Sequence, residues 1–323
     1  MQKRILVLGA GGFVGRRLVT ALGAAEWATP IAGVRVLPVA APKGIEHRIL
    51  DATRESDLNQ ALTGVDAVVN CVAGNSASII ESARALFSAA ARAPASPRVI
   101  HLSTMSVYGD VSGSVDESAA LRPELGPYAA AKVAAEQASA AYPNTVILRP
   151  GCVYGPGSPQ WSGRIAELLM ARRLGDLAAN GDGCCNLVHV DDVVTAITRA
   201  LQLPEARSAV YNLSTPEPPT WNEYLVRFAR ALKAVPVRRI SPRRLKIEAK
   251  LLAPPLKILE MALRIARLRW PVPPAIPPSL LKLMQQEIKL DVRRAEAELG
   301  LRWIPLDVGL NDTAGWYLRL KNR

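Results

Sequence analysis

The sequence lacks the marks of several protein classes. Aromatic residues make up only 5% of the 323 residues, and the longest apolar runs, such as Ile5 to Leu8, span a few residues. A membrane-spanning helix needs about 20. The four cysteines have neither disulfide nor metal-ligand spacing, and no apolar signal segment precedes the first predicted strand. These absences predict a reduced, cytoplasmic protein without a metal site.

Acidic residues are also scarce, with 28 against 40 basic residues and a net charge of +12. Residues 238–273 hold ten basic and two acidic residues, so this segment carries +8 of that charge. A local basic patch is typical of proteins that bind nucleic acid, an anionic membrane surface or an anionic substrate. Trp270 is the one aromatic residue in the segment, and the chain has no nucleic-acid-binding motif, so we expect no nucleic acid partner.

Two interpretations of residues 238–273 remain open. Apolar residues recur there at helical spacing, with cations interleaved: Ile247, Leu251, Leu252, Leu256, Leu259, Leu263 and Ala266. The favoured interpretation is a helix whose apolar stripe packs on the core while its cations are solvated. The alternative is peripheral contact with an anionic membrane, where the segment also covers a lipophilic substrate.

The first half of the chain alternates between apolar strand-like runs and helical segments. Predicted strands lie at 4–8, 30–36, 67–72, 98–102 and 145–148, and predicted helices at 13–25, 56–62, 76–91 and 127–141. Continuous rather than alternating apolar strands predict an α/β fold, with a doubly wound parallel sheet covered by helices on both faces. We expect the sheet domain in 1–153, with a return segment at 187–214. A smaller, mostly helical substrate lobe is expected in 154–186 and 215–323.

A glycine-rich turn, Gly9 to Gly15, joins the first strand to the first helix. Glycine permits a tight turn and close backbone approach to a pyrophosphate, while the helix N-terminus offers free N–H groups. In this strand–turn–helix context the motif predicts a dinucleotide site. The second strand lacks the usual acid for the ribose hydroxyls and is followed by Arg35, which suits a 2′-phosphate. NADP is therefore favoured over NAD.

Tyr128 and Lys132 are four residues apart, which places them on one face of a predicted helix. A nearby ammonium is expected to lower the pKa of the phenol toward a value useful for proton transfer. Thr104 follows the strand at 98–102, so its hydroxyl is expected at the carboxyl edge of the sheet, where sites of such sheets lie.

These motifs, with others in the same order, resemble the extended short-chain dehydrogenases/reductases of the NAD-dependent epimerase/dehydratase type, which have a Rossmann sheet. The further matches are Asp51-Ala52, the segment 66–71, the segments 148–157 and 189–193, and a terminal pattern from Leu299 to Trp316. The resemblance covers nearly the whole chain.

The resemblance implies roles for individual residues. Tyr128 would be the general acid/base, Lys132 would tune it and bind the nicotinamide ribose, and Thr104 would orient the reacting oxygen. His189, Asp191 and Asp192 would mainly join the two lobes. The implied cofactor-binding residues are Gly9, Gly12, Phe13, Val14, Gly15, Arg35, Asp51, Ala52, Cys71, Val72, Ala73, Lys132, Pro150 and Val153. We also expect a homodimer.

The chain departs from the family pattern at positions that bear on the substrate. Met105 and Ser106 stand where family dehydratases carry an acidic pair, which disfavours an elimination reaction. Cys152 and Cys185 stand where many nucleotide-sugar enzymes carry an Asn and a phosphate-binding Arg. Arg164, Arg172 and Arg173 are the basic residues that could substitute for that Arg.

Three functions remain open. The first is an NAD(P)-dependent oxidoreductase that transfers a hydride between the nicotinamide and a carbonyl or secondary alcohol of a non-nucleotide, lipophilic substrate. The second is a nucleotide-sugar epimerase or reductase. The third, a non-catalytic nucleotide-binding protein, is disfavoured because Thr104, Tyr128 and Lys132 are all present.

Overall fold

A computed structural model describes residues 2–37, 44–204, 208–266, 268 and 272–322. Arg267, Arg269 and Trp270, which belong to the basic segment of the sequence analysis, lie outside the described residues.

Seven parallel strands form the central sheet in the order β10-β7-β5-β4-β1-β2-β3. Their bounds are β1 (Lys3–Leu8), β2 (Ala28–Val34), β3 (Glu46–Ile49), β4 (Ala67–Asn70), β5 (Arg98–Leu102), β7 (Thr145–Pro150) and β10 (Ala209–Leu213). The middle strands β4 and β7 are buried along their whole length, which explains why their sequences are apolar without alternation. The predicted α/β fold with a doubly wound parallel sheet is confirmed.

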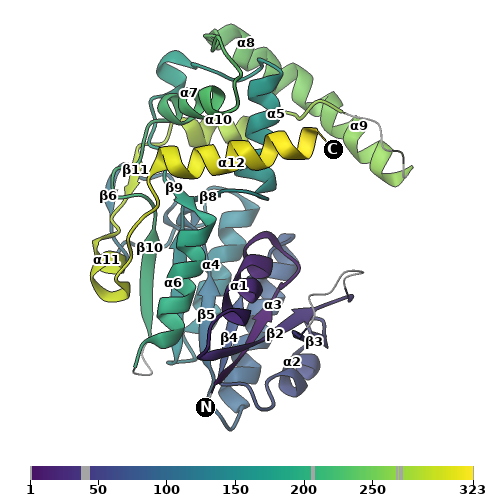
Figure 1. The fold of residues 1–323 in the computed structure, drawn as a ribbon, viewed down its shortest axis with the longest axis vertical. Helices are drawn as coiled ribbons and strands as arrows, with labels where there is room; N and C mark the ends of the chain where they lie inside the picture. The colour runs from purple at the N-terminus through teal and green to yellow at the C-terminus, as the bar shows by residue number, and fades with distance from the viewer. Residues whose placement is uncertain (1, 38–43, 205–207, 267, 269–271, 323) are drawn as a thin grey trace.

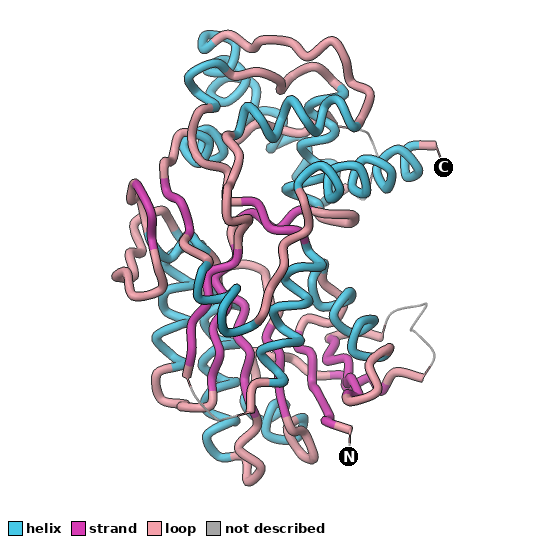
Figure 2. Tube along the Cα trace, turned by 60° about the vertical axis from the view of Figure 1, so that its left-hand side comes forward, coloured by secondary structure: helices cyan, strands magenta, loops and turns pink. Residues whose placement is uncertain are grey.

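Two sets of helices cover the two faces of this sheet (Figure 1). Helices α1 (Phe13–Gly23), α6 (Val190–Gln202) and α11 (Arg293–Leu299) pack in one apolar cluster with the strands. Helices α2 (Glu55–Ala61), α3 (Ser76–Arg92) and α4 (Pro127–Ser139) pack in another. Figure 2 shows the strands side by side below, with a mostly helical upper part.

The upper part has its own apolar cluster, which includes the fully buried Trp221, Tyr224 and Phe228. Its elements include β8 (Cys152–Tyr154), β9 (Leu187–His189), α5 (Ile165–Met170), α7 (Trp221–Ala231), α10 (Pro278–Met284) and α12 (Leu306–Lys321). Short helical turns lie at η1 (Met105–Tyr108), η2 (Pro159–Arg164) and η3 (Ala178–Gly181). The strand β6 (Gly113–Val115) forms a parallel pair with β11 (Ile288–Leu290), which is far from it in the sequence. The division into two lobes at the stated boundaries stays a prediction.

Three helical pieces, α8 (Pro242–Ile247), η4 (Glu248–Leu252) and α9 (Ala253–Ile265), follow one another directly, and we name them together the arm. The turn at η4 is π-helical, and Pro254 and Pro255 fall in the first turn of α9, where missing N–H groups are tolerated best. The prolines therefore do not interrupt the helical course.

The favoured interpretation of residues 238–273, in which the apolar residues of a helix pack on the core, is wrong. Ile247, Leu251, Leu252 and Leu259 are exposed at 48%, 67%, 43% and 46%, rather than packed on the core. Figure 1 shows why: α9 extends away from the rest of the molecule, so nearly its whole circumference faces outward. Within the described part of the chain, no helix combines the length and apolarity that crossing a membrane requires.

Candidate active site

The sequence-predicted site residues gather at one edge of the sheet. The glycine turn follows β1, Arg35 follows β2, Asp51 and Ala52 follow β3, Cys71 to Ala73 follow β4, and Thr104 follows β5. Pro150 ends β7, and Val153 lies in the next strand. Because parallel strands share their carboxyl ends, this arrangement collects residues from six strands along one edge of the sheet.

The glycine turn has the geometry of a dinucleotide cradle. Gly9 has φ +75°, and a Cβ there would lie 2.9 Å from the Cys71 carbonyl oxygen. A Cβ on Gly15 would lie 2.3 Å from the Gly9 carbonyl oxygen, so helix α1 packs against the turn only with glycine. Gly12 precedes α1 without a capping side chain, which leaves the amides of Phe13 and Val14 available to a pyrophosphate. These residues fit the cofactor.

Arg35 and Asp51 lie where that edge is formed by β2 and β3. Arg35 is exposed, and it is one of the cations that lower the pKa of Asp51. The main cause of that lowered pKa is hydrogen bonding from Thr53, whose N–H and hydroxyl donate to Asp51 Oδ1 at 3.0 and 2.8 Å. Asp51 is thus held as a carboxylate within the turn after β3, and Arg35 remains open to solvent.

Tyr128 lies in the first turn of α4 with 48% of the residue exposed. The protein around its hydroxyl raises its pKa, and the neighbouring Thr104 hydroxyl partly lowers it. Thr104 is nearly buried, and its hydroxyl receives the Ser106 N–H at 3.3 Å. One hydroxyl from a helix and one from a strand end are therefore neighbours at the carboxyl edge of the sheet.

Lys132 lies one turn deeper and is buried, at 4% exposure. Burial lowers its pKa to about 8, although Cys71 and Glu136 act in the opposite direction. Its ammonium donates to the Leu102 carbonyl oxygen at 2.7 Å. The expected lowering of the Tyr128 pKa by Lys132 is wrong for this structure, because the protein packed around the Tyr128 hydroxyl raises that pKa, and the Lys132 ammonium donates to the end of β5.

A buried polar network behind Lys132 was missed by the sequence analysis. Arg149 on β7 donates to Glu136 Oε2 from Nη2 at 2.7 Å, with side-chain exposures of 5% and 3%. Ser103 also donates to Glu136, while Arg149 donates to Tyr108, whose hydroxyl donates in turn to Asn212 Oδ1 at 2.6 Å. The signal was present, since Glu136 follows Lys132 by four residues on the face that carries Tyr128.

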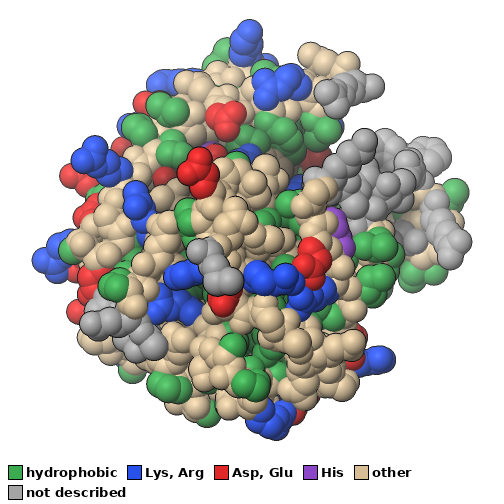
Figure 3. Space-filling view, turned by 60° about the horizontal axis from the view of Figure 1, so that its bottom comes forward, with side chains coloured by type: hydrophobic (Ala, Val, Ile, Leu, Met, Phe, Trp, Pro, Cys, Tyr) green, Lys and Arg blue, Asp and Glu red, His purple; other side chains and the backbone are tan. Residues whose placement is uncertain are grey.

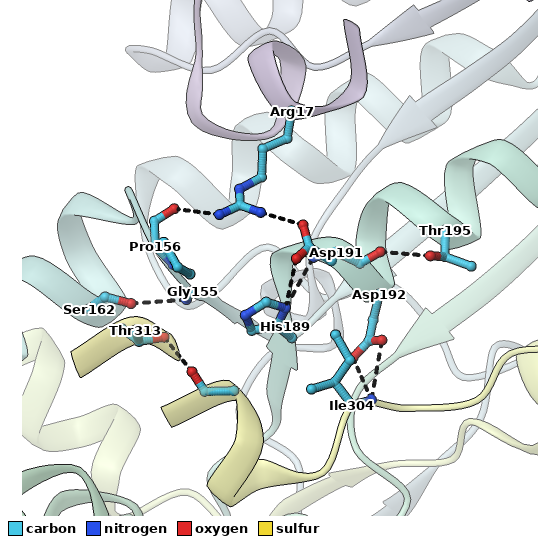
Figure 4. A network of polar contacts seen from close by, with 11 residues as sticks. Arg17, Gly155, Pro156, Ser162, His189, Asp191, Asp192, Thr195, Ile304 and Thr313 are labelled. Carbon is cyan, nitrogen blue, oxygen red and sulfur yellow. Dashed lines mark hydrogen bonds and ion pairs between the residues drawn. The ribbon is translucent and has the colours of Figure 1, made fainter. Parts of the chain in front are cut away.

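The residues expected to join the lobes lie in a second polar network, and their joining role stays a prediction (Figure 4). Arg17 on α1 donates to Asp191 at 2.5 Å and to the Pro156 carbonyl oxygen at 3.2 Å. Asp192 receives the Ile304 N–H at 3.2 Å, and burial raises its pKa to about 6. His189 Nδ1 accepts the Asp191 N–H at 3.3 Å and caps α6.

The two positions where the chain departs from nucleotide-sugar enzymes are closed to a ligand. Cys152 and Cys185 are exposed at 3% and 0% and belong to the apolar cluster of the upper part. Arg173 is engaged as well, because its Nε donates to both carboxylate oxygens of Glu248 at 3.2 and 3.1 Å.

Comparison with known proteins points to one family. Residues 5–214 match the model of the NAD dependent epimerase/dehydratase family. The chain is 28% identical over 243 residues to 2'-dehydrokanamycin reductase of Streptomyces kanamyceticus, covering 71% of this chain and 66% of that protein. It is 29% identical over 254 residues to 2-alkyl-3-oxoalkanoate reductase of Stenotrophomonas maltophilia, covering 72% and 76%.

The fold agrees with solved structures over almost the full length. UDP-glucuronic acid 4-epimerase from Bacillus cereus, in complex with NAD, superposes with a TM-score of 0.68 at 21% identity, over 98% of this chain and 99% of that one. The chain therefore belongs to the NAD-dependent epimerase/dehydratase family, as an enzyme of the extended short-chain dehydrogenase/reductase type.

Proposed function

We propose that the protein reduces a ketone, or oxidises the matching secondary alcohol, on a substrate that is not a nucleotide sugar. The observation that carries this proposal is the pair of neighbouring hydroxyls at the carboxyl edge of the sheet: Tyr128 beside Thr104, one helical turn from the buried Lys132. Both family relatives named above are reductases, which supports carbonyl reduction as the reaction.

The proposed mechanism assigns one task to each residue. When bound, the nicotinamide would supply or accept the hydride. The Tyr128 hydroxyl would donate its proton to the substrate oxygen, and its raised pKa keeps it protonated for this step. The Thr104 hydroxyl would hold the same oxygen by a hydrogen bond. Lys132, fixed on the Leu102 carbonyl, would bind the nicotinamide ribose beneath them.

The proposed cofactor is NADP rather than NAD. The glycine turn with Phe13 and Val14 would bind the pyrophosphate, Asp51 and Ala52 would lie beside the adenine, and Arg35 would pair with the 2′-phosphate. Cys71, Val72, Ala73, Pro150 and Val153 would line the remaining length of the dinucleotide. The exposed guanidinium of Arg35 at the end of β2 supports the preference.

Two observations favour the non-nucleotide substrate over the alternative. The positions that hold an Asn and an Arg in many nucleotide-sugar enzymes are buried cysteines here, and Arg173 is paired with Glu248. The alternative, a nucleotide-sugar epimerase or reductase, is favoured by the solved structure of MoeE5 in complex with UDP-glucuronic acid and NAD, which superposes with a TM-score of 0.71.

One experiment separates these functions. The purified protein is given NADPH or NADH with a panel of β-keto acids and amino-sugar ketones, and separately given UDP-, GDP- and dTDP-sugars. We expect consumption of the reduced cofactor with a ketone, faster with NADPH. Interconversion of a nucleotide sugar without net cofactor consumption would instead assign the alternative.

Homodimer formation and a cytoplasmic location are further proposals. Size-exclusion chromatography with light scattering tests the first, and cell fractionation tests the second. A monomeric mass would contradict the homodimer. Peripheral membrane contact through 238–273 is also proposed, and the exposed apolar residues of the arm support it.

A further inference from the structure

Six apolar residues of the arm form one exposed line. Their spacing is four, three, four, three and four residues, so they recur at close to one helical turn, and we name them the stripe: Ile247, Leu251, Pro254, Ile258, Met261 and Ile265. All six are exposed, and Leu251, Ile258 and Ile265 reach 67%, 66% and 78%. Aliphatic side chains this open, in a row along one helical segment, mark an interaction surface.

Cations follow one border of the stripe. Lys246, Lys250 and Lys257 each immediately precede a stripe residue, so each is displaced by the same angle around the helix. All three are exposed. The border on the other side continues apolar through the exposed Leu252 and Leu259. The arm thus has a wide apolar face edged by positive charge on one side.

The base of the arm is fixed to the upper part of the molecule. Leu245, Ala249 and Ala253, four residues apart, are buried on the face that contacts the lobe. Glu248 is buried beside them and receives Arg173, whose Nη1 also donates to the Pro274 carbonyl oxygen at 2.9 Å. The carboxylate that lies between Lys246 and Lys250 in the sequence is therefore neutralised within the protein, and the arm beyond it extends outward (Figure 1).

The rest of the molecule lacks this concentration of charge. On the face seen in Figure 3, which is the lower end in Figure 1, basic and acidic side chains are interspersed. Residues outside 238–273 share a net charge of only +4, the difference between +12 and +8. Any attraction of an anionic surface would therefore act mainly on residues 238–273, which contain the arm, and it would orient the molecule.

We propose that the arm docks on an anionic phospholipid bilayer, with the stripe inserted at the level of the headgroups. A helix that binds in this way lies in the plane of the interface, with its apolar face down and Lys or Arg at the border reaching the phosphates. The apolar face, its cationic border and the neutralised Glu248 together match that pattern.

A second copy of the chain is the competing occupant. Spacing of three and four residues also suits a coiled-coil seam. Two arms packed together would bring the positive charges of both copies close to one another, where they repel. An anionic bilayer attracts all of these charges. Charge complementarity therefore favours the bilayer.

The test uses the full-length protein and vesicles of phosphatidylglycerol and phosphatidylcholine in equal parts, with pure phosphatidylcholine vesicles for comparison. We expect the protein to co-sediment with the anionic vesicles at low salt, to bind the neutral ones much less, and to dissociate as salt rises. The absence of binding to anionic vesicles at low salt overturns the proposal.

Two pairs of variants locate the contact. Lys250→Gln with Lys257→Gln should lower the partition coefficient about fivefold per cation removed. The matched control, Arg199→Gln with Arg302→Gln, removes the same charge from exposed positions elsewhere and should lower it much less. Ile258→Asp with Ile265→Asp should abolish binding, whereas Ile49→Asp with Val308→Asp, at similarly exposed positions, should not.

Cofactor titration verifies that every variant is folded, and it is independent of whether the proposed reduction is correct. Equal losses in the arm variants and their controls overturn the proposal. Sedimentation velocity reports on the second copy: a change of oligomeric state on Ile258→Asp with Ile265→Asp, without vesicle binding by the unmodified protein, assigns the stripe to self-association and also overturns it.

Discussion

The buried network around Glu136 and the exposed arm both contain charged residues, but in opposite environments. Glu136 and Arg149 are almost fully buried and paired, with Ser103 and Tyr108 completing their hydrogen bonds. Lys246 and Lys250 are exposed along an apolar face. Burial without pairing is costly, so buried charges must be matched within the fold. Exposed charges carry no such requirement and remain available to ligands and surfaces.

This contrast separates residues that hold the fold from residues that act on something else. Tyr128 and Arg35 are exposed at the carboxyl edge of the sheet. Replacing them should therefore change the reaction rate or cofactor binding, with little effect on folding. Glu136, Arg149 and Asp192 are buried, so replacing them should change stability first. Four substitutions test that division, and any of them could break it.

The largest effect is expected from Tyr128→Phe. It removes the proposed proton donor and keeps the ring, so kcat should fall about 10²–10⁴-fold while cofactor affinity and thermal stability stay nearly unchanged. Steady-state kinetics and thermal unfolding measure both. Tyr142→Phe is the control with the reverse signature: its hydroxyl donates to the Pro97 carbonyl oxygen at 2.7 Å, so stability should fall by about 1 kcal/mol with the rate retained. A Tyr128→Phe enzyme that kept a tenth of its rate would contradict the proposed role.

The next effect is on stability. Glu136→Gln leaves the Arg149 guanidinium buried without its carboxylate, and breaking a buried pair on one side costs about 3–5 kcal/mol. Urea unfolding measures the loss. The control Glu46→Gln breaks the pairs of the exposed Glu46 with Arg4 and Arg48, each at 2.9 Å, and should cost about 0–1 kcal/mol. Similar losses in the two variants would show that burial does not distinguish these pairs.

A smaller effect is expected at the cofactor. Arg35→Gln should weaken NADPH binding by about 1.5–3 kcal/mol, the contribution of a hydrogen bond to a charged group, and should leave NADH binding and stability unchanged. Isothermal titration of the variant with each cofactor measures the difference, with Arg302→Gln as the distant control. Equal affinity of the unmodified protein for NADPH and NADH would disprove the preference for NADP.

The sheet and the location of the site could be predicted from the sequence for one shared reason. Strands buried on both faces are continuously apolar, and parallel strands place whatever follows them at a common edge. The glycine turn, Thr104 and Cys71 could therefore be assigned to the same edge before any contact was known. Helical spacing alone predicted that Tyr128 and Lys132 share one face of a helix, whereas their roles came from the family resemblance and stay predictions.

What could not be predicted depends on contacts between distant segments. The partner of Glu136 is on β7, and β6 pairs with a strand about 170 residues later, near Ile288. Exposure of the arm is also a tertiary property, because the same apolar spacing serves a packed helix and an open one. The expected effect of Lys132 on Tyr128 was wrong for a related reason: the Leu102 carbonyl holds the ammonium.

Asp192 provides the smallest predicted effect, as a buried acid that receives the Ile304 N–H and whose pKa the backbone of His189 also helps to lower. Burial raises its pKa to about 6 from 3.8, so the folded protein holds this proton more tightly than the unfolded chain. The resulting stabilisation is complete below about pH 4 and is lost as the pH rises through about 6. Asp192→Asn keeps an acceptor for Ile304 and removes the titration. It should therefore raise the free energy of unfolding by about 1–2 kcal/mol at pH 7 and leave it unchanged near pH 4, as measured by urea unfolding at both values.

Asp191→Asn should do the opposite at pH 7, because Asp191 is half-exposed and paired with Arg17. A destabilised Asp192→Asn protein at pH 7 would mean that the carboxylate contributes more to joining the lobes than its burial costs, and the distinction between buried and exposed charges would then fail at this site.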